Sequence, residues 1–387
     1  MCATDWLMCN NILFLHKIIF KIIVGDSMLF GNNKPHIKKV LVDLSILKHI
    51  NCGLGQIAYN YAKYFSEHAD EFDFEIHLLV PKTLVGHFGD KVHYLPSRKT
   101  FRRYPFLVPR YDVWHSIHQL SSYMPFFNST RNILTVHDLN FVYEKEGLKY
   151  RKALRKMKRR VNRADKIVAI SNFAKTDLLR FFPDIDNVEV IYNGVEFTQS
   201  GELGQMPSAP FDNSRKFLFT IGQVMEKKNF HVLLDVMKLM PEYNLYIAGT
   251  NSTSYGDMIR ERIESERISN VVLLGEILHE ERTWLYSNCE AFVFPSKFEG
   301  FGLPVIEALS YGKPVISSRM TSLAEIGSTH VFFMDNFDAD HIADRIRTGI
   351  REYAEHPELA TASIEYARSF TYEKHIKRYL EIYRSLL

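Results

Sequence analysis

The sequence predicts an α/β protein with two doubly wound parallel-sheet domains in tandem. The chain has 387 residues, a length that suits two domains. Short β-branched runs alternate with amphipathic helical segments in two successive series, the pattern of parallel sheets covered on both faces. Between the series, residues 198–214 are rich in Gly, Pro and Ser and have no hydrophobic period, which is typical of a linker.

Composition narrows the class of protein. Hydrophobic residues make up 46% and charged residues 24% of the chain, values that exclude disordered, collagen-like and disulfide-stapled proteins. The four cysteines are scattered, without zinc or redox spacing, and fit a reducing compartment. The formal net charge is +3, which does not indicate a nucleic-acid-binding protein.

The first series begins with a β-branched run and an amphipathic helix behind a glycine-containing loop. Strands are predicted at 38–44, 74–80, 113–117, 132–139, 166–170 and 188–194, and helices at 54–65, 148–163 and 171–182. Ser171 is in place to cap the last of these helices, because its hydroxyl can accept from a free backbone N–H.

The second series repeats the alternation. Strands are predicted at 216–222, 243–249, 270–275, 291–296 and 314–318, and helices at 229–240, 255–266, 280–288 and 304–312. Ligands of such sheets bind beyond the carboxyl ends of the strands, so the cleft between two facing domains is the expected site.

These patterns give the domain boundaries. We expect an N-terminal domain over 28–200, a linker over 201–214 and a C-terminal domain over 215–370. The amphipathic segment 371–387 is predicted to be a helix that packs back across the junction between the domains.

Residues 1–27 form an N-terminal extension whose apolar run, 11–24, is too short to span a membrane. Three interpretations remain open. The segment is an interfacial amphipathic helix, a poor signal peptide, or an extension absent from a native protein that starts at Met28.

The segment 292–318 carries the strongest chemical signal. A strand leads into a loop with Glu299, Gly300 and Gly302, and a helix begins near Pro304 and carries Glu307. Glycines allow close backbone approach to a ligand, and a helix N-terminus favours phosphate. The two carboxylates are placed to hold sugar or ribose hydroxyls.

Glu299 and Glu307, with seven residues between them in this strand–loop–helix, resemble the signature of retaining glycosyltransferases of family 4 (glycosyl transferases group 1). The resemblance implies the GT-B fold, in which two facing Rossmann-like domains enclose a cleft. It further implies transfer of a sugar from a nucleotide-diphosphate sugar, with retention of anomeric configuration and without a metal or other cofactor.

Residues 220–229 resemble the family's loop in which an Arg and a Lys grip the nucleotide diphosphate. Lys228 matches the Lys, but Gln223 stands at the Arg position, and Lys227 is a candidate replacement. The resemblance implies a donor-binding set of Gly222, Gln223, Lys228, Glu299, Phe301, Gly302, Leu303 and Glu307.

Residues 135–139 resemble the segment that places a histidine near the reacting sugar, here His137. The catalytic set implied is therefore Glu299, His137 and Lys228. His115 and His118 also stand near a strand end, where either would contact an acceptor.

Residues 52–56 resemble the glycine loop that lies against the donor phosphates and acceptor. Gly53 and Gly55 match, whereas Gln56 replaces a frequent Arg. Asp338 and Asp340 are interpreted as helix-start residues rather than metal ligands, and no other His, Cys or Asp cluster has ligand spacing.

The charge is unevenly distributed. Residues 149–166 contain ten Lys or Arg and one Asp, a net of +9, which leaves about −6 for the rest of the chain. Anionic lipid attracts such clusters. Because the family often uses lipid-linked acceptors, we expect a cytoplasmic protein peripheral on the inner face of the cell membrane, with residues 97–110 joining the basic surface.

The leading hypothesis is a retaining glycosyltransferase that builds a bacterial surface polysaccharide or lipid-linked glycan from a UDP- or GDP-sugar. The contexts of Lys228 and His137 lean toward mannosyl transfer. A sugar-nucleotide epimerase of similar architecture and a non-catalytic sugar-binding subunit are the alternatives.

Overall fold

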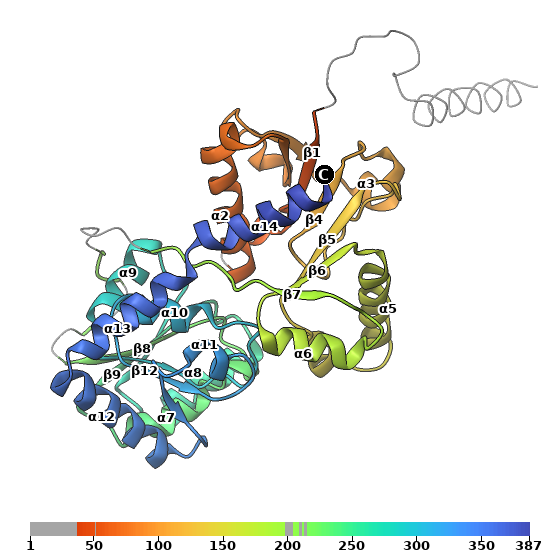
Figure 1. Ribbon diagram of the computed structural model, residues 1–387. Helices are drawn as coiled ribbons and strands as arrows, with labels where there is room; N and C mark the ends of the chain where they lie inside the picture. The colour runs from red at the N-terminus through yellow and green to blue at the C-terminus, as the bar shows by residue number, and fades with distance from the viewer. Residues whose placement is uncertain (1–36, 51, 198–203, 209–210, 213–214) are drawn as a thin grey trace, which may run out of the picture. The chain divides into compact units, whose positions relative to one another are not determined.

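A computed structural model describes residues 37–50, 52–197, 204–208, 211–212 and 215–387 (Figure 1). The helices and strands given below belong to one compact unit, Lys38–Leu387. The expectations for residues 1–27 lie outside the described residues. Below, residues 38–197 are called the N-terminal half and residues 215–370 the C-terminal half.

The N-terminal half is built on a seven-stranded parallel sheet of order β3-β2-β1-β4-β5-β6-β7. Its strands are β1 (Lys39–Asp43), β2 (Glu75–Val80), β3 (His93–Pro96), β4 (Val113–Ser116), β5 (Arg131–Val136), β6 (Lys166–Ala169) and β7 (Val188–Val190). The sequence did not predict β3, a partly exposed edge strand of four residues.

Helices cover this sheet on both faces (Figure 1). They are α2 (Gly53–His68), α3 (Lys99–Arg103), α4 (Asn140–Glu144), α5 (Gly147–Arg163) and α6 (Asn172–Phe181). Ser171 caps α6 as predicted, since its hydroxyl accepts from Ala174 N at 3.0 Å. Helix α2 begins behind Cys52, whose sulfur accepts from Gly55 N.

The C-terminal half is built on a six-stranded parallel sheet of order β10-β9-β8-β11-β12-β13. Its strands are β8 (Phe217–Ile221), β9 (Asn244–Ala248), β10 (Val271–Gly275), β11 (Ala291–Phe294), β12 (Val315–Ser318) and β13 (Phe332–Met334). Its helices are α7 (His231–Lys238), α8 (Ser254–Ser265), α9 (His279–Asn288), α10 (Leu303–Ser310), α11 (Leu323–Gly327), α12 (Ala339–Glu355) and α13 (Glu358–Ala367). Two α/β units with parallel sheets confirm the predicted fold class.

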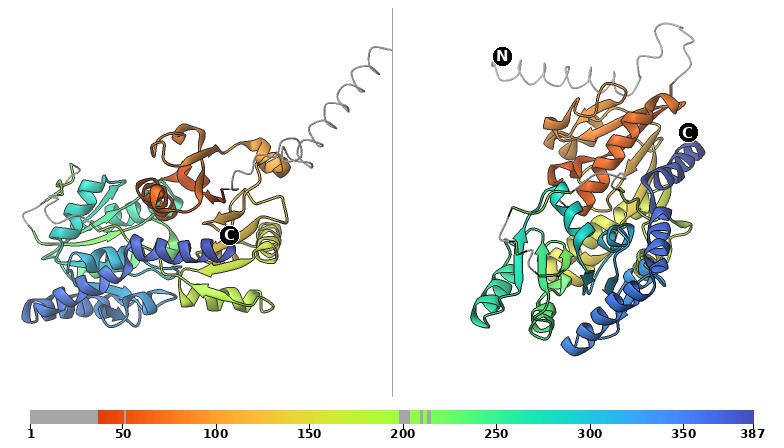
Figure 2. Two further views of the ribbon diagram at one scale, coloured as in Figure 1. Left: turned by 45° about the horizontal axis from the view of Figure 1, so that its top comes forward. Right: turned by 90° about the vertical axis from the view of Figure 1, so that its left-hand side faces the viewer.

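The last helix, α14 (Tyr372–Leu386), returns to the N-terminal half and packs against α2 (Figures 1 and 2). Ile376, Tyr379 and Tyr383 on its inner face are fully buried in the core of the first sheet. Phe211, near the end of the linker, packs on the C-terminal half, where its ring stacks on Tyr246. None of the described helices is both long enough and apolar enough to cross a bilayer.

Candidate active site

The loop before α10 has a backbone that requires glycine. Gly302, the N-cap of α10, has φ +107°, and a Cβ atom there would lie 2.6 Å from Leu323 Cδ2. Pro304 stands in the first turn of the helix, where its missing N–H costs nothing. The loop therefore exposes the free N–H groups of an eight-residue helix toward the carboxyl edge of the sheet.

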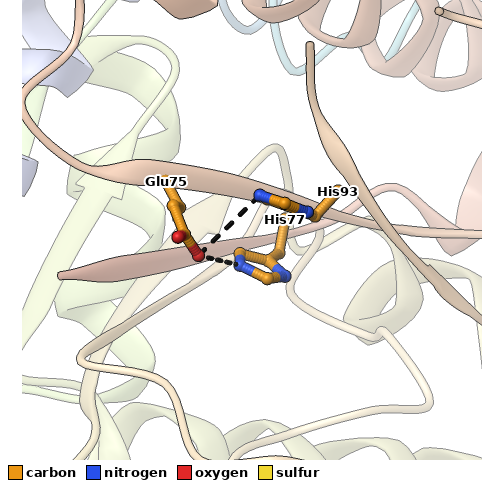
Figure 3. Close-up of side chains that lie close together, drawn as sticks. All are labelled: Glu75, His77 and His93. Carbon is orange, nitrogen blue, oxygen red and sulfur yellow. Dashed lines mark hydrogen bonds and ion pairs between the residues drawn. The ribbon is translucent and has the colours of Figure 1, made fainter. Parts of the chain in front are cut away.

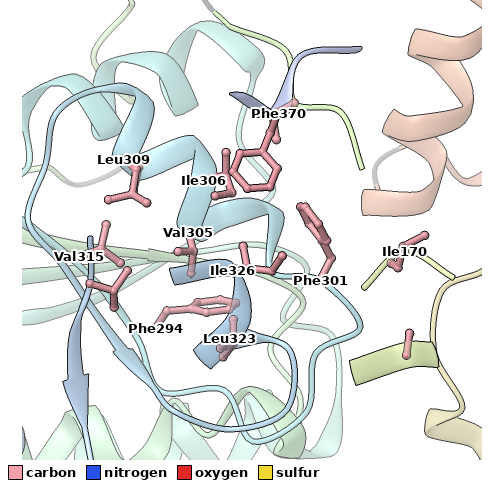
Figure 4. Close-up of a cluster of buried hydrophobic side chains, with 14 of the residues drawn as sticks. Ile170, Phe294, Phe301, Val305, Ile306, Leu309, Val315, Leu323, Ile326 and Phe370 are labelled. Atoms are coloured by element: carbon pink, nitrogen blue, oxygen red, sulfur yellow. The ribbon is translucent and has the colours of Figure 1, made fainter. Parts of the chain in front are cut away.

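A hydrophobic cluster below the loop holds it in place (Figure 4). Phe301 is 3% exposed, and Val305 and Ile306 on α10 are fully buried in the same cluster. Two side chains after β12 bind the loop backbone: Glu299 N donates to Thr321 Oγ1 at 3.0 Å, and Ser322 Oγ donates to Glu299 O at 3.0 Å. These contacts fix the backbone that carries the Glu299 side chain.

Lys228 and Glu299 form an ion pair with Nζ–Oε1 2.5 Å. Their side chains are 13% and 14% exposed, so little water screens the pair. The Lys228 ammonium also lies 4.9 Å from the centre of the Phe294 ring, and a Cβ atom on Gly222 would lie 3.2 Å from Lys228 Cε. The structure therefore brings together three residues of the predicted donor set.

Glu307 lies on α10 and contacts residues of α9. Its carboxylate accepts from the Tyr286 hydroxyl at 2.7 Å and faces Arg282 at 3.7 Å. A small cavity beside it is lined by residues of both halves, among them Gln56, Glu196 and Leu303. Burial and the Glu307 charge raise the pKa of Tyr286.

Arg282 is a candidate functional residue that the sequence analysis missed. It lies on α9, an ordinary surface helix without a motif, and the Glu307 carboxylate raises its pKa further. Lys227, the candidate replacement for the missing Arg, pairs through its ammonium with Glu144 of α4 at 3.0 Å. Gln223, at the Arg position, is exposed.

His137 follows β5 at the carboxyl edge of the first sheet. Its Nε2 lies 2.7 Å from Ile117 O, and its backbone N–H donates to Gln119 Oε1 at 3.0 Å. A Cβ atom on Gly300 would lie 2.2 Å from His137 O, so the Glu299 loop touches the histidine's backbone. Burial lowers the pKa of His137 to about 4, which keeps the imidazole neutral at physiological pH.

His118 stands beside His137, with ring centroids 6.5 Å apart. Burial and the His137 ring lower its pKa to about 3. His115 does not contact an acceptor, and the expectation that it would was wrong. It is fully buried, and its ring is hydrogen-bonded to Tyr383 and Thr135 inside the core.

The two glycines of the first loop have different roles. Gly53 opens α2, and a Cβ atom there would lie 3.8 Å from Leu303 Cδ1, so the glycine loop reaches the start of α10. Gly55 instead permits close packing within its own chain, since a Cβ atom there would lie 2.1 Å from His49 O. This close packing alone explains why residue 55 is a glycine, whether or not it also contacts a ligand phosphate.

Direct contacts join the halves beside the site. Ser171 Oγ donates to Gly300 O at 2.8 Å. The Glu325 carboxylate of α11 accepts from the backbone N–H groups of Asn172 and Phe173, the first turn of α6, at 2.8 and 3.0 Å. A carboxylate at a helix N-terminus is favourable because it meets free N–H groups and the positive end of the helix dipole.

The basic segment forms α5, and its cations divide between the core and the surface. Arg160 is 4% exposed and donates to Ser121 O and Tyr123 O. Lys156 and the α3 cations line a wide concave surface consisting of Lys99, Arg102, Arg103, Ser122 and Lys156. Burial and the neighbouring Arg160 and Arg102 lower the pKa of Lys156 to about 8. Residues 97–110 thus join the basic surface, as the sequence predicted.

The aspartates at the start of α12 agree with a helix-start role. Asp338 occupies the N-cap position without a side-chain capping bond, and Asp340 lies in the first turn. Asp340 is placed favourably against the helix dipole.

Two families match adjoining parts of the chain. Residues 60–199 match the family described as Glycosyltransferase Family 4, and residues 205–370 match Glycosyl transferases group 1. Among curated proteins, the chain is 25% identical over 309 residues to O-antigen chain mannosyltransferase B of Escherichia coli, covering 73% of this chain and 79% of that protein. It is 27% identical over 212 residues to O-antigen chain mannosyltransferase RfbU of Salmonella typhimurium, covering 53% and 57%.

Solved structures share the fold at low sequence identity. Anabaena HepE, crystallised with UDP and glucose, superposes with a TM-score of 0.71 at 17% identity, over 90% of this chain and 100% of that one. Sucrose-phosphate synthase from Thermosynechococcus elongatus superposes with a TM-score of 0.67 at 19% identity, over 90% and 99%. The two-domain architecture of these proteins is the one that the sequence predicted.

Proposed function

The chain belongs to the family 4 glycosyltransferases (glycosyl transferases group 1) of GT-B fold, and from this premise we propose a reaction. The protein transfers a sugar from a nucleotide-diphosphate sugar to a glycan or lipid-linked acceptor, with retention of anomeric configuration. The observation that carries the proposal is the Lys228–Glu299 pair beside the N-terminus of α10.

The C-terminal half binds the donor in this proposal. Lys228 and the free N–H groups of α10 stabilise the negative charge that develops on the leaving diphosphate, which is why no metal is required. When the diphosphate arrives, the Lys228 ammonium turns from Glu299 to the phosphate oxygens, and the freed Glu299 carboxylate accepts from hydroxyls of the donor sugar. Glu307, with Arg282 beside it, holds the ribose hydroxyls.

The N-terminal half supplies the acceptor side. His137 is a neutral imidazole at the carboxyl edge of the first sheet, next to the Glu299 loop. In the neutral form, a ring whose Nε2–H donates to Ile117 O keeps Nδ1 as an acceptor. It therefore orients a hydroxyl of the sugar or acceptor rather than acting as a cation.

The relatives narrow the substrate class. Two of them are named as O-antigen mannosyltransferases, which supports mannosyl transfer in surface polysaccharide synthesis. The HepE structure is a complex with UDP and glucose, which supports a nucleotide-sugar donor for this chain. We therefore place a GDP- or UDP-sugar in the site, with mannose as the favoured sugar.

The exposed cations of α5 and the concave surface with Lys156 support docking on anionic lipid. Lys149, Arg151, Lys152, Arg155, Lys158 and Arg159 are exposed on α5. Each basic residue near an anionic surface contributes about 1 kcal/mol of binding. The protein thus works at the cytoplasmic face of the membrane, where a lipid-linked acceptor meets the N-terminal half.

Transfer from a panel of GDP- and UDP-sugars to lipid-linked acceptors tests the proposal. We expect one donor to react in the presence of EDTA, with the product's anomeric configuration retained by NMR. Glu299→Ala should lower the rate at least about 100-fold, the size seen when charge-stabilising groups are removed from active sites. The variant should keep its fold, since among the described residues the Glu299 side chain is held by a single ion pair, with Lys228.

The matched control is Glu226→Ala, an exposed glutamate in the same basic loop as Lys228. Full activity in Glu299→Ala would contradict the assignment. Interconversion of two nucleotide sugars without transfer would favour the epimerase, and donor binding without turnover would favour a sugar-binding subunit.

A further inference from the structure

Three potential metal ligands gather on neighbouring strands of the first sheet (Figure 3). Glu75 and His77 are two residues apart on β2, so both side chains stand on the same face. The register of the parallel pair places His77 opposite His93 on β3. The pairing of β2 with β3 therefore assembles a cluster that sequence spacing did not reveal.

The ligand atoms are already close to coordinating distance. Glu75 Oε2 lies 3.1 Å from His77 Nε2 and 3.8 Å from His93 Nε2. All the ligand atoms lie within 4.8 Å of one another. With metal–ligand bonds of about 2.0–2.2 Å, two ligands of a tetrahedral ion stand roughly 3.4 Å apart, which is close to these separations. The His77 and His93 rings are stacked with centroids 4.5 Å apart, so they turn toward the ion when it binds.

We propose that Glu75, His77 and His93 bind a divalent transition-metal ion and that zinc is the preferred ion. Two imidazole nitrogens and one carboxylate oxygen are a zinc ligand set, whereas calcium and magnesium take oxygen ligands. A water molecule completes the four-coordinate shell, because His93 is exposed and its strand lies at the edge of the sheet.

The position of the cluster separates it from sugar transfer. Glu75 and His93 are the first residues of their strands, so the cluster lies toward the amino edge of the sheet. The candidate active site lies at the carboxyl edge, where His137 follows β5. The ion would clip the four-residue edge strand β3 onto β2, and its role is to stabilise the N-terminal half.

Lys39 competes with the ion. Its ammonium lies 3.8 Å from Glu75 Oε2 and holds part of the carboxylate charge. The side chain is 41% exposed and can swing into solvent when a cation binds. Removing this charge while keeping the apolar stem, as in Lys39→Met, should therefore raise metal affinity.

Titration of the chelator-treated full-length protein with Co²⁺, followed by competition with Zn²⁺, tests the proposal. We expect one equivalent to bind with the visible absorption of a four-coordinate cobalt site, and zinc to displace it and raise the unfolding temperature. His93→Ala and Glu75→Gln should each weaken binding at least about tenfold. Circular dichroism would establish that both variants are folded.

His356→Ala is the matched control. It removes an exposed imidazole that lies 3.2 Å from a single carboxylate, Glu358, outside any cluster of three ligands found among the described residues. Its cobalt affinity should equal that of the wild type. The proposal is overturned if the wild-type protein binds no stoichiometric cobalt or zinc, or if His93→Ala and Glu75→Gln bind as tightly as the wild type.

Discussion

The C-terminal half presents Lys228 and Glu299 to the candidate site as a charged pair, whereas the N-terminal half presents His118 and His137 as half-buried, neutral imidazoles. The paired charges neutralise one another until a ligand separates them. The histidines face mainly backbone and other rings, and their low pKa values keep them neutral. In the proposed reaction, charge therefore faces the donor and neutral hydrogen-bonding groups face the acceptor.

The difference extends behind the site. The N-terminal half is joined to α14 by buried polar contacts: His375 Nε2 lies 2.7 Å from the Tyr61 hydroxyl, and His115 Nδ1 lies 2.7 Å from the Tyr383 hydroxyl. Among the described residues, the two buried histidines are His115 and His375, and neither lies in the C-terminal half. The N-terminal half thus depends on neutral histidines for part of its stability.

The largest effect that we predict is a loss of stability of the N-terminal half in acid. Burial lowers the pKa of His137 and His375 to about 4 and that of His118 to about 3. In the unfolded chain each titrates near 6.5, so between pH 6.5 and 4 the unfolded state binds more protons. The stabilisation is complete above pH 6.5 and falls by about 2 kcal/mol per histidine at pH 5.

Denaturant unfolding at pH 7.5 and pH 5.0 measures this loss. Buried Asp43 and Asp138, whose pKa values burial raises, act in the opposite direction, so a histidine variant is the cleaner readout. His118→Asn should reduce the pH dependence by about 2 kcal/mol. His356→Ala, which removes an exposed histidine, should leave the pH dependence of stability unchanged. An unaltered pH dependence in His118→Asn would contradict the conclusion that the His118 ring is neutral in the folded protein.

A second, somewhat smaller effect concerns the outer surface of the N-terminal half. Replacing the exposed Arg151, Lys152 and Arg155 of α5 with alanine should weaken binding to anionic vesicles by about 3 kcal/mol, or about 100-fold. Sedimentation with vesicles containing phosphatidylglycerol, at rising salt, measures the change. Salt should abolish wild-type binding because the attraction is electrostatic.

The control for this experiment lies in the C-terminal half. Arg347, Arg351 and Arg368 are equally exposed, and their replacement with alanine should leave vesicle binding unchanged. Equal losses in both triple variants would show a general charge effect rather than docking through α5. Absence of wild-type binding at low salt would refute the membrane proposal.

The sequence predicted the charged side of the site better than the neutral side. Lys228 and Glu299 stand in glycine-flanked loops at strand ends, and such loops can be recognised from their amino-acid composition. Arg282 escaped because it lies on an ordinary helix, and only the packing of α9 beside α10 brings it to Glu307. The observation that points to Arg282 is its 3.7 Å distance from Glu307, and the sequence does not give distances.

The other errors have related causes. His115 was assigned to an acceptor contact because it stands near a strand end. Its ring instead bonds to Tyr383 of α14, which lies more than 200 residues further along the chain. The edge strands β3 and β13 are short, with four and three residues, so they lack a measurable period. The cluster of Glu75, His77 and His93 was missed because cross-strand pairing, not spacing, assembles it.

The smallest effect that we predict tests the charged pair directly. Lys228→Met keeps the apolar stem but removes the ammonium that lies 2.5 Å from Glu299 Oε1. A charge-assisted hydrogen bond contributes about 1.5–3 kcal/mol, so affinity for the nucleoside diphosphate should fall about 10- to 100-fold by calorimetry. The unpaired Glu299 carboxylate would add repulsion against the phosphates.

Lys227→Met is the matched control, because Lys227 pairs with Glu144 across the halves rather than with Glu299. Its affinity for nucleoside diphosphate should stay within about twofold, since its charge is held away from the Lys228–Glu299 pair. Equal losses in the two variants would mean that the loop attracts phosphate by net charge alone. A loss confined to Lys228→Met would mean that one placed ammonium, rather than the charge of the whole loop, recognises the diphosphate.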